Sequence, residues 1–118
     1  MSIANKAFAW LLFAAGGTLT ALLFPVLIAL FLLVSMGEVP SGLEYGAIHG
    51  FAGSIIGGTV LFIVVSLSAW HAAHRMRVLA HDLGIRADRA VALAVYSLAL
   101  IATVGAAVLL IVIRSAGS

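Results

Sequence analysis

Three long apolar blocks, separated by two short polar segments, most constrain what this chain can fold into. The blocks cover about residues 7–35, 43–78 and 87–114. Each exceeds the roughly 20 residues that a helix needs to cross the hydrocarbon core of a bilayer. Three segments are too few to close a β-barrel, so only helices can satisfy the backbone of such spans in lipid. The blocks therefore predict an all-α integral membrane protein, a single domain over residues 1–118 with three transmembrane helices.

The amino-acid composition supports contact with membrane lipid. Hydrophobic residues make up 64% of the 118 residues and charged residues only 8%, which is more apolar surface than a soluble domain of this size can bury. The formal net charge of +2 is too small to indicate a nucleic-acid partner. With no cysteine in the chain, disulfides and cysteine-ligated metal sites are excluded.

The distribution of charge predicts the orientation of the spans. Basic residues lie near the N-terminus and around the second polar segment, at Lys6, Arg75, Arg77, Arg86 and Arg89. The first polar segment carries Glu38 and Glu44 and no basic residue. By the positive-inside rule, the N-terminus and the second loop are cytoplasmic and the C-terminus lies outside. Arg114, near the C-terminus and so at the predicted outer face, is the one basic residue that does not follow this rule.

Local residues predict where the helices begin, end and bend. Ser41 and Glu44 have the S-x-x-E spacing of a capping box before the second block. Gly84 is suited to the end of the second helix, and Asp88 to the cap of the third. Pro25 lies inside the first block and is expected to kink that helix.

Four glycines of the second block have the spacing of a helix-packing surface. Gly46 and Gly50 form one small-x-x-x-small pair, and Gly53 and Gly57 form the next. Such pairs let helix backbones approach closely where lipid gives no hydrophobic drive for association. The spacing predicts helix packing, either among the three helices of this chain or onto a second membrane subunit.

The segment WHAAHRMRVLAHDLG, residues 70–84, concentrates the scarce polar residues. His71, His74 and Arg75 have i, i+3, i+4 spacing and project from one side of a helix. One interpretation is an interfacial fringe, with Arg and His side chains reaching toward lipid headgroups. A haem site is disfavoured because His49 and His74 lie about 37 Å apart on the predicted second helix, while the other two helices have no histidine. Without a mid-membrane acid, a proton-coupled transporter is also disfavoured.

A binding site for an amphipathic ligand is the other interpretation of this segment. In the predicted orientation, Trp10 and Phe13 lie at the same membrane depth as His71 and His74, near the cytoplasmic face. A quinone suits this place, because its tail lies in lipid while its head group needs hydrogen bonds at both oxygens. A histidine can accept a proton there, a nearby arginine can stabilise negative charge, and an indole N–H can donate.

Four stretches of the sequence carry a resemblance to a known family. The chain contains AWLLFAAGG (9–17), ALLFPVLIAL with its interior proline (21–30), FAGSIIGGTVLF (51–62) and HRMRVLAHDLG (74–84). These stretches resemble the first two helices and the second loop of the D subunit of bacterial fumarate reductase, a small hydrophobic membrane anchor. The resemblance covers most of the chain, although the third helix adds little beyond hydrophobicity.

The resemblance implies a role in a membrane-bound respiratory complex. In that family the chain is one of two small membrane anchors that hold a flavoprotein and an iron–sulfur subunit at the cytoplasmic face of the bacterial inner membrane. FAD and the iron–sulfur clusters would then lie in partner subunits, and this chain would not itself catalyse fumarate reduction. A haem-free anchor serving menaquinone or ubiquinone is implied. An anchor of a succinate:quinone reductase and a purely structural assembly protein remain alternatives.

The resemblance also implies residue roles. It assigns the proximal quinol site to Trp10, Phe13, Ala14, His74 and Arg75, with Ala14 at a position where the family can have glycine. His71 is placed at the rim of this site. Arg77, Arg86 and Arg89 are expected at the headgroup fringe, where they would dock the soluble subunits. No catalytic residue and no metal ligand is expected in this chain.

Overall fold

The computed structural model describes residues 2–117, and the described residues form four helices: α1 (Ile3–Ser35), α2 (Tyr45–Gly53), α3 (Ile55–Asp82) and α4 (Asp88–Ala116). Three of these, α1, α3 and α4, are long and apolar enough to cross a membrane. The predicted all-helical class with three membrane-spanning helices is therefore confirmed. The first predicted helix ends at Ser35 as expected, whereas α3 continues past residue 78 to Asp82.

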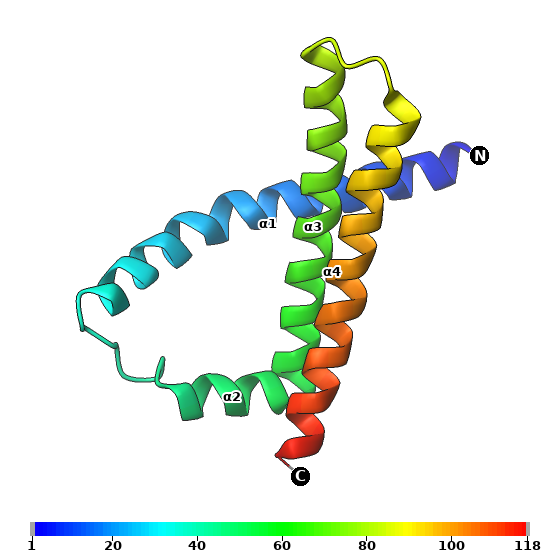
Figure 1. The fold of residues 1–118 in the computed structure, drawn as a ribbon. Helices are drawn as coiled ribbons and strands as arrows, with labels where there is room; N and C mark the ends of the chain where they lie inside the picture. Colours follow the sequence, from blue (N-terminus) through cyan, green and yellow to red (C-terminus); the bar gives the residue numbers. More distant parts are fainter. Residues whose placement is uncertain (1, 118) are drawn as a thin grey trace.

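Helices α3 and α4 run side by side as a hairpin (Figure 1). Their shared core consists of small residues, with Ala73 of α3 buried against Val95 and Ala99 of α4. Ala69 and Val91 extend this packing along each helix. Small side chains at intervals of four residues let the two backbones approach closely. This alanine and valine surface, rather than the predicted glycine pairs, joins the two helices.

The turn between α3 and α4 follows the predicted chemistry in part. Gly84 has a φ of +88° just after the end of α3, a left-handed conformation that favours glycine. The prediction for Gly84 is confirmed. Asp88 is the first residue of α4 and Ala87 is the N-cap, so Asp88 does not cap this helix. Its carboxylate is instead paired with Arg77 of α3.

Helix α1 crosses α3 at a steep angle (Figure 1) and remains one continuous helix through Pro25. The crossing point is Gly16, where an added Cβ would come 2.5 Å from the carbonyl oxygen of Leu67. The hydroxyls of Thr20 and Ser68 are hydrogen-bonded across the crossing at 3.0 Å. Close backbone approach at glycine and an interhelical hydrogen bond are the two interactions that hold helices together in lipid.

The length of α1 is compatible with this steep crossing. Its 33 residues give a helix about 50 Å long at 1.5 Å per residue. The hydrocarbon core of a bilayer is only about 30 Å thick. A helix of this length can span the core while strongly tilted relative to the α3–α4 hairpin.

The second predicted helix is divided, so the expectation of one helix over residues 43–78 is wrong. Ser54 lies between α2 and α3 with φ −76° and ψ 159°, an extended conformation. Its hydroxyl accepts the backbone N–H of Gly57 at 2.9 Å and donates to the Phe51 carbonyl at 2.7 Å. A Cβ on Gly57 would overlap the Phe51 carbonyl oxygen, at 1.9 Å. The turn therefore depends on the serine cap and on glycine at position 57.

The predicted capping box before this helix does not form. Glu44 is the N-cap of α2, but its side chain makes no capping hydrogen bond. Helix α2 lies across the lower ends of α3 and α4 (Figure 1) and contacts both. The C-terminus lies at this same end of the hairpin, whereas the α3–α4 turn is at the opposite end.

Candidate functional site

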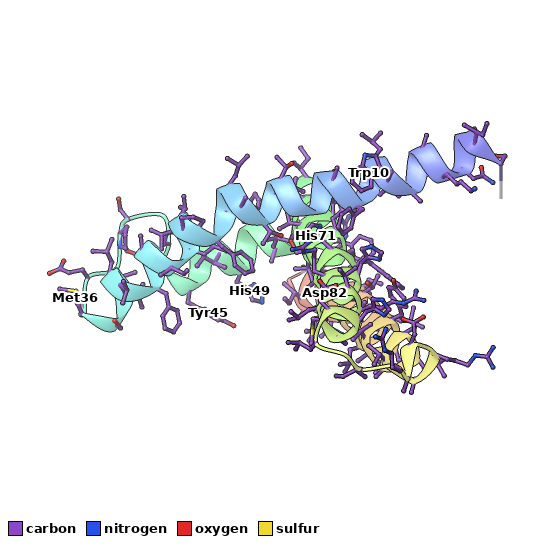
Figure 2. The ribbon with its side chains drawn as sticks, turned by 90° about the horizontal axis from the view of Figure 1, so that it is seen from above. Trp10, Met36, Tyr45, His49, His71 and Asp82 are labelled. Atoms are coloured by element: carbon purple, nitrogen blue, oxygen red, sulfur yellow. The ribbon has the colours of Figure 1, made fainter. Side chains whose placement is uncertain are left out.

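A cavity of about 620 Å³ lies where α1 crosses α3, with α4 forming part of its wall. Its polar and aromatic lining consists of Lys6, Trp10, Phe13, Trp70, His71, His74 and Tyr96. The remaining lining residues are aliphatic. Figure 2 shows Trp10 on α1 near the crossing and His71 on α3 at the crossing itself. Residues about sixty positions apart in the sequence thus share one cavity.

Phe13 occupies the centre of the contact between α1 and α3. Its ring stacks on the imidazole of His71, with centroids 4.3 Å apart and an interplanar angle of 21°. The ring of His74 meets the same phenyl group edge-on, at 4.8 Å and 74°. Trp10 lies 5.6 Å from Phe13 on its other side. One phenylalanine therefore orients two imidazole rings, through the offset and edge-on contacts that aromatic rings favour.

His71, which was expected only at the rim of the site, is a wall of the cavity. Its Nδ1 lies 2.9 Å from the backbone carbonyl oxygen of Phe13. A carbonyl can only accept, so this hydrogen bond requires a proton on Nδ1 of His71. Gly17 makes room for the ring, because a Cβ there would come 2.5 Å from Cε1 of His71. In the neutral side chain, Nε2 is consequently an acceptor.

His74 lies one turn further along α3 and has a different partner. Its Nδ1 is 3.0 Å from the hydroxyl of Tyr96 on α4. Tyr96 also stacks on Trp70, with ring centroids 6.0 Å apart, and the indole N–H of Trp70 donates to the hydroxyl of Thr103 at 3.0 Å. Sequence reasoning missed Tyr96 and Trp70. For Trp70 the available signal was an aromatic ring next to His71 in the sequence.

Two residues assigned to the site by resemblance lie outside the cavity that this chain forms. Arg75 is exposed at the position after His74 and does not line the cavity. Ala14 follows Phe13 on α1 and does not line it either. Their assignment to a quinol site remains a prediction. It would require a site that extends beyond this cavity and includes residues of a neighbouring subunit.

The arginines differ in what they contact within the chain. Arg77 forms a bidentate pair with Asp88, with Nε 2.8 Å from one carboxylate oxygen. Its guanidinium carbon also lies 5.8 Å from the ring centroid of Tyr96. Arg77 therefore links α3 to α4, a role that the predicted docking function did not include. Arg86 and Arg89 are exposed around the turn.

The predicted packing glycines have unequal surroundings. At Gly46 and Gly50, an added Cβ would meet nothing within 4 Å. Gly53 faces α4, where a Cβ would lie 3.6 Å from Cγ2 of Ile113. Gly57 serves the turn between α2 and α3 and not a helix–helix contact. Gly46 and Gly50 therefore do not pack against another helix among the described residues, and their packing onto a second subunit stays a prediction.

His49 belongs to the opposite end of the molecule. It lies on α2, where its ring is 5.6 Å from that of Tyr45. Figure 1 shows α2 at the end of the hairpin opposite the α3–α4 turn and away from the crossing of α1 and α3. The premise that His49 and His74 share one helix is wrong, because α2 and α3 are separate helices.

The cavity combines apolar walls with a few groups that can exchange protons or hydrogen bonds. Two imidazoles, two indoles and a phenol line it, and Lys6 adds a cation one turn before Trp10. Pockets of this size with mostly apolar lining and few polar groups suit small amphipathic ligands. A flat ring carrying two oxygen atoms could stack on the aromatic side chains while the imidazoles and indole hydrogen-bond its oxygens.

Comparisons with known proteins give one consistent result. The sequence model of a family described as the D subunit of fumarate reductase matches residues 2–111. The fumarate reductase D subunit of Aliivibrio fischeri (strain MJ11) is 40% identical over 97 residues, which cover 80% of this chain and 81% of the relative. The D subunit of Mycobacterium tuberculosis (strain ATCC 25177 / H37Ra) is 41% identical over 97 residues, covering 80% and 77%. That of Vibrio vulnificus (strain YJ016) is 38% identical over 92 residues, covering 76% and 74%.

Proposed function

The chain belongs to the family of fumarate reductase D subunits, and on that premise we propose that it forms the quinol site of a membrane-bound fumarate reductase. In this proposal it also attaches the flavoprotein and iron–sulfur subunits to the membrane. The complex transfers electrons between menaquinol or ubiquinol and fumarate. The same site serves quinone reduction when such a complex works as a succinate:quinone reductase.

The observation that carries this proposal is the cavity at the α1–α3 crossing. It brings Trp10 and Phe13 of one helix against His71 and His74 of another. These are the residues whose spacing and depth suggested a quinol site in the sequence, with His71 as a wall. The combination of aromatic walls and titratable imidazoles fits a quinol head group better than an isolated fringe of headgroup contacts.

Each side chain has a distinct part in this proposal. A bound quinol supplies two electrons and two protons when it is oxidised. Nε2 of His74 accepts a proton from a quinol hydroxyl, since Nδ1 is occupied by Tyr96. Nε2 of His71 accepts the hydrogen bond of the other hydroxyl or of a bridging group. The indole N–H of Trp10 donates to an oxygen of the head group, and Phe13 keeps both imidazoles in place.

The charges of the molecule support an orientation with the site near the cytoplasmic face. Four arginines lie at the end of the hairpin that carries the α3–α4 turn, and Arg114 is at the other end. This asymmetry favours a cytoplasmic turn in the bacterial inner membrane. Exposed Arg86 and Arg89 then face the soluble subunits. Electrons from the quinol would enter the iron–sulfur subunit there, and the FAD held by the flavoprotein subunit would supply the chemistry of fumarate reduction.

The second membrane anchor has a surface available on α1 and α2. The C-terminal half of α1 diverges from α3 (Figure 1) and exposes large apolar side chains, including Phe24, Phe31 and Leu32. Gly46 and Gly50 on α2 have open space above them. We place the second anchor on these surfaces, where small residues allow close approach.

The proposal is tested by His74→Ala in the assembled complex. Removing the proton acceptor is expected to lower quinol-dependent fumarate reduction on the order of 10²-fold. Fumarate reduction with an artificial dye, which bypasses the membrane subunits, should be unchanged. His81→Ala is the matched control, because His81 is exposed at the end of α3 and does not line the cavity.

Normal quinol turnover in an assembled His74→Ala complex would overturn the site assignment. That outcome would favour a purely structural anchor, in which the polar residues of α3 serve only as a headgroup fringe. Loss of both quinol and dye activities would instead indicate that the variant no longer assembles with its partners. Flavin content per complex separates that case from a defect in turnover.

A further inference from the structure

Tyr96 contacts three side chains that lie one helical turn apart on one face of α3. Its ring stacks on Trp70 at 6.0 Å, its hydroxyl lies 3.0 Å from Nδ1 of His74, and its ring faces the guanidinium of Arg77 at 5.8 Å. These α3 residues are four and three positions apart, so they lie along one stripe of the helix. Tyr96 therefore contacts Trp70 one turn before His74 and Arg77 one turn after it, in addition to its hydrogen bond with His74.

The neighbours of Tyr96 are themselves fixed. Trp70 donates its indole N–H to Thr103 of α4 at 3.0 Å. Arg77 is held by its bidentate pair with Asp88. The backbone of α4 near Tyr96 packs against α3 through buried Val95 and Ala99. The hydroxyl of Tyr96 consequently has a defined position relative to His74.

The two histidines of the cavity have partners of different capability. The Phe13 carbonyl beside His71 can only accept a hydrogen bond, so it keeps the proton on Nδ1 of that residue. The hydroxyl of Tyr96 can donate or accept. It can therefore stay bonded to Nδ1 of His74 when the imidazole is neutral in either tautomer and when it is protonated. Nε2 of His74 is then free to act as a donor or as an acceptor.

We propose that Tyr96 is a positioning residue that keeps His74 directed at the quinol while the imidazole changes its protonation. This inference rests on the proposed function of the cavity. With a quinol bound, the hydroxyl of Tyr96 accepts a hydrogen bond from Nδ1–H, and Nε2 takes the proton of one quinol hydroxyl, which leaves His74 as an imidazolium. The proton of the other hydroxyl leaves through its own acceptor, Nε2 of His71 or a bridging group, and the two electrons would pass to the iron–sulfur subunit. With a quinone bound, Tyr96 donates to Nδ1 of the neutral imidazole, and the Nε2–H group donates a hydrogen bond to the carbonyl oxygen. When the quinone is reduced, the proton comes from Nε2 of the doubly protonated imidazole, while Tyr96 accepts a hydrogen bond from Nδ1–H. One hydroxyl thus serves both directions of the reaction.

The test is a double-mutant cycle of Tyr96→Phe and His74→Ala in the intact membrane complex. Phenylalanine keeps the ring that contacts Trp70 and Arg77 and removes only the hydroxyl. Tyr96→Phe is expected to lower kcat for quinol oxidation about tenfold, the loss of one hydrogen bond to a group that becomes charged. KM should change by less than about twofold, because Tyr96 acts through His74. Adding Tyr96→Phe to His74→Ala should cause no further loss.

The controls separate positioning from structure. Tyr45→Phe makes the same chemical change at the other tyrosine, on α2 and 82% exposed, and should leave kcat unchanged. Unchanged kcat in Tyr96→Phe would overturn the proposal, as would an equal loss in the presence and absence of His74. If His74→Ala itself retains normal turnover, the proposed function fails as well. If His74→Ala is impaired and Tyr96→Phe is not, the positioning role alone fails.

Discussion

His71 and His74 lie one turn apart on α3, yet their surroundings fit them for different work. His71 is stacked on Phe13 and bonded to its carbonyl, so its ring and its tautomer are both fixed. His74 touches the same phenyl ring only edge-on and is bonded to a hydroxyl. A fixed imidazole is suited to binding and an adaptable one to proton transfer. The difference between the two histidines has two causes in the backbone. Helix α1 approaches His71 closely at Gly17, and α4 is rotated so that Tyr96 faces His74.

Gly17→Ala tests the role of close approach at the site. A Cβ at residue 17 would lie 2.5 Å from Cε1 of His71, so the imidazole must turn away from Phe13. The efficiency of quinol oxidation, kcat/KM, is expected to fall about tenfold because a binding group is misplaced. Steady-state quinol oxidation by the purified complex measures this. Gly105→Ala, where a Cβ meets nothing within 4 Å, should have no effect; equal behaviour of the two variants would contradict the role assigned to Gly17.

At the residue scale, the sequence predicted the meeting of Trp10 and Phe13 with the histidine segment, because topology and charge place them at one depth. It did not predict Tyr96. Helix α4 is apolar around most of its circumference, so no polar stripe indicates which face turns toward α3. The sequence placed Arg75 with His71 and His74 by helical spacing, and the resemblance assigned it to the quinol site. In the structure both His74 and Arg75 are exposed, but only His74 lines the cavity, because adjacent positions on a helix are rotated by about 100°.

The helices show which signals a membrane sequence carries and which it lacks. Apolar length located α1, α3 and α4 because lipid imposes that length directly. The break at Ser54 was missed because the surrounding residues remain apolar and small, so hydropathy does not register it. The local chemistry was nevertheless present: Ser54 caps α3, and Gly57 alone accommodates the Phe51 carbonyl. The steep crossing of α1 depends on contacts at Gly16 and Thr20 that periodicity does not reveal.

Paired cysteines test the crossing of α1 and α3, and the chain is suited to this because it has no native cysteine. Thr20→Cys with Ser68→Cys replaces two hydroxyls 3.0 Å apart, which is within reach of a disulfide. Oxidation should cross-link the pair efficiently in membranes, as detected by peptide mapping. Thr20→Cys with Ser66→Cys is the control, because residue 66 lies on the opposite side of α3. Cross-linking of the control pair alone would show a different rotation of the helices.

At the scale of the whole molecule, charged residues gather toward the end of the hairpin that carries the α3–α4 turn. The cavity, the Arg77–Asp88 pair and exposed Arg86 and Arg89 all belong to this half. The other end has α2, the C-terminus and Arg114. Such an uneven distribution of charge between the two ends suits an anchor whose partners bind on one side of the membrane. The sequence predicted this asymmetry from the loop charges alone, whereas the surface that we propose for a second anchor depends on the arrangement of α1 and α2.

Reversing the exposed charges at the turn tests the docking role. Arg86→Glu combined with Arg89→Glu should release the flavoprotein and iron–sulfur subunits from membranes, because favourable contacts are replaced by repulsion with the same partner surface. Release is measured as dye-linked fumarate reductase activity in the soluble fraction at low ionic strength, where the repulsion is least screened. Arg114→Glu changes the charge at the opposite end and should leave the subunits bound. Full retention by the double variant would contradict docking at the turn.

The central claim, that quinol binds where α1 crosses α3, is tested most directly by photolabelling the intact complex with an azidoquinone. We expect label on peptides containing Trp10 or Phe13 and on peptides containing His71 or His74, with protection by excess quinol. A second groove of about 300 Å³, lined by Phe62 and Leu110 at the opposite end of the hairpin, provides an internal comparison. Protectable label confined to that groove, with none at the crossing, would contradict the claim.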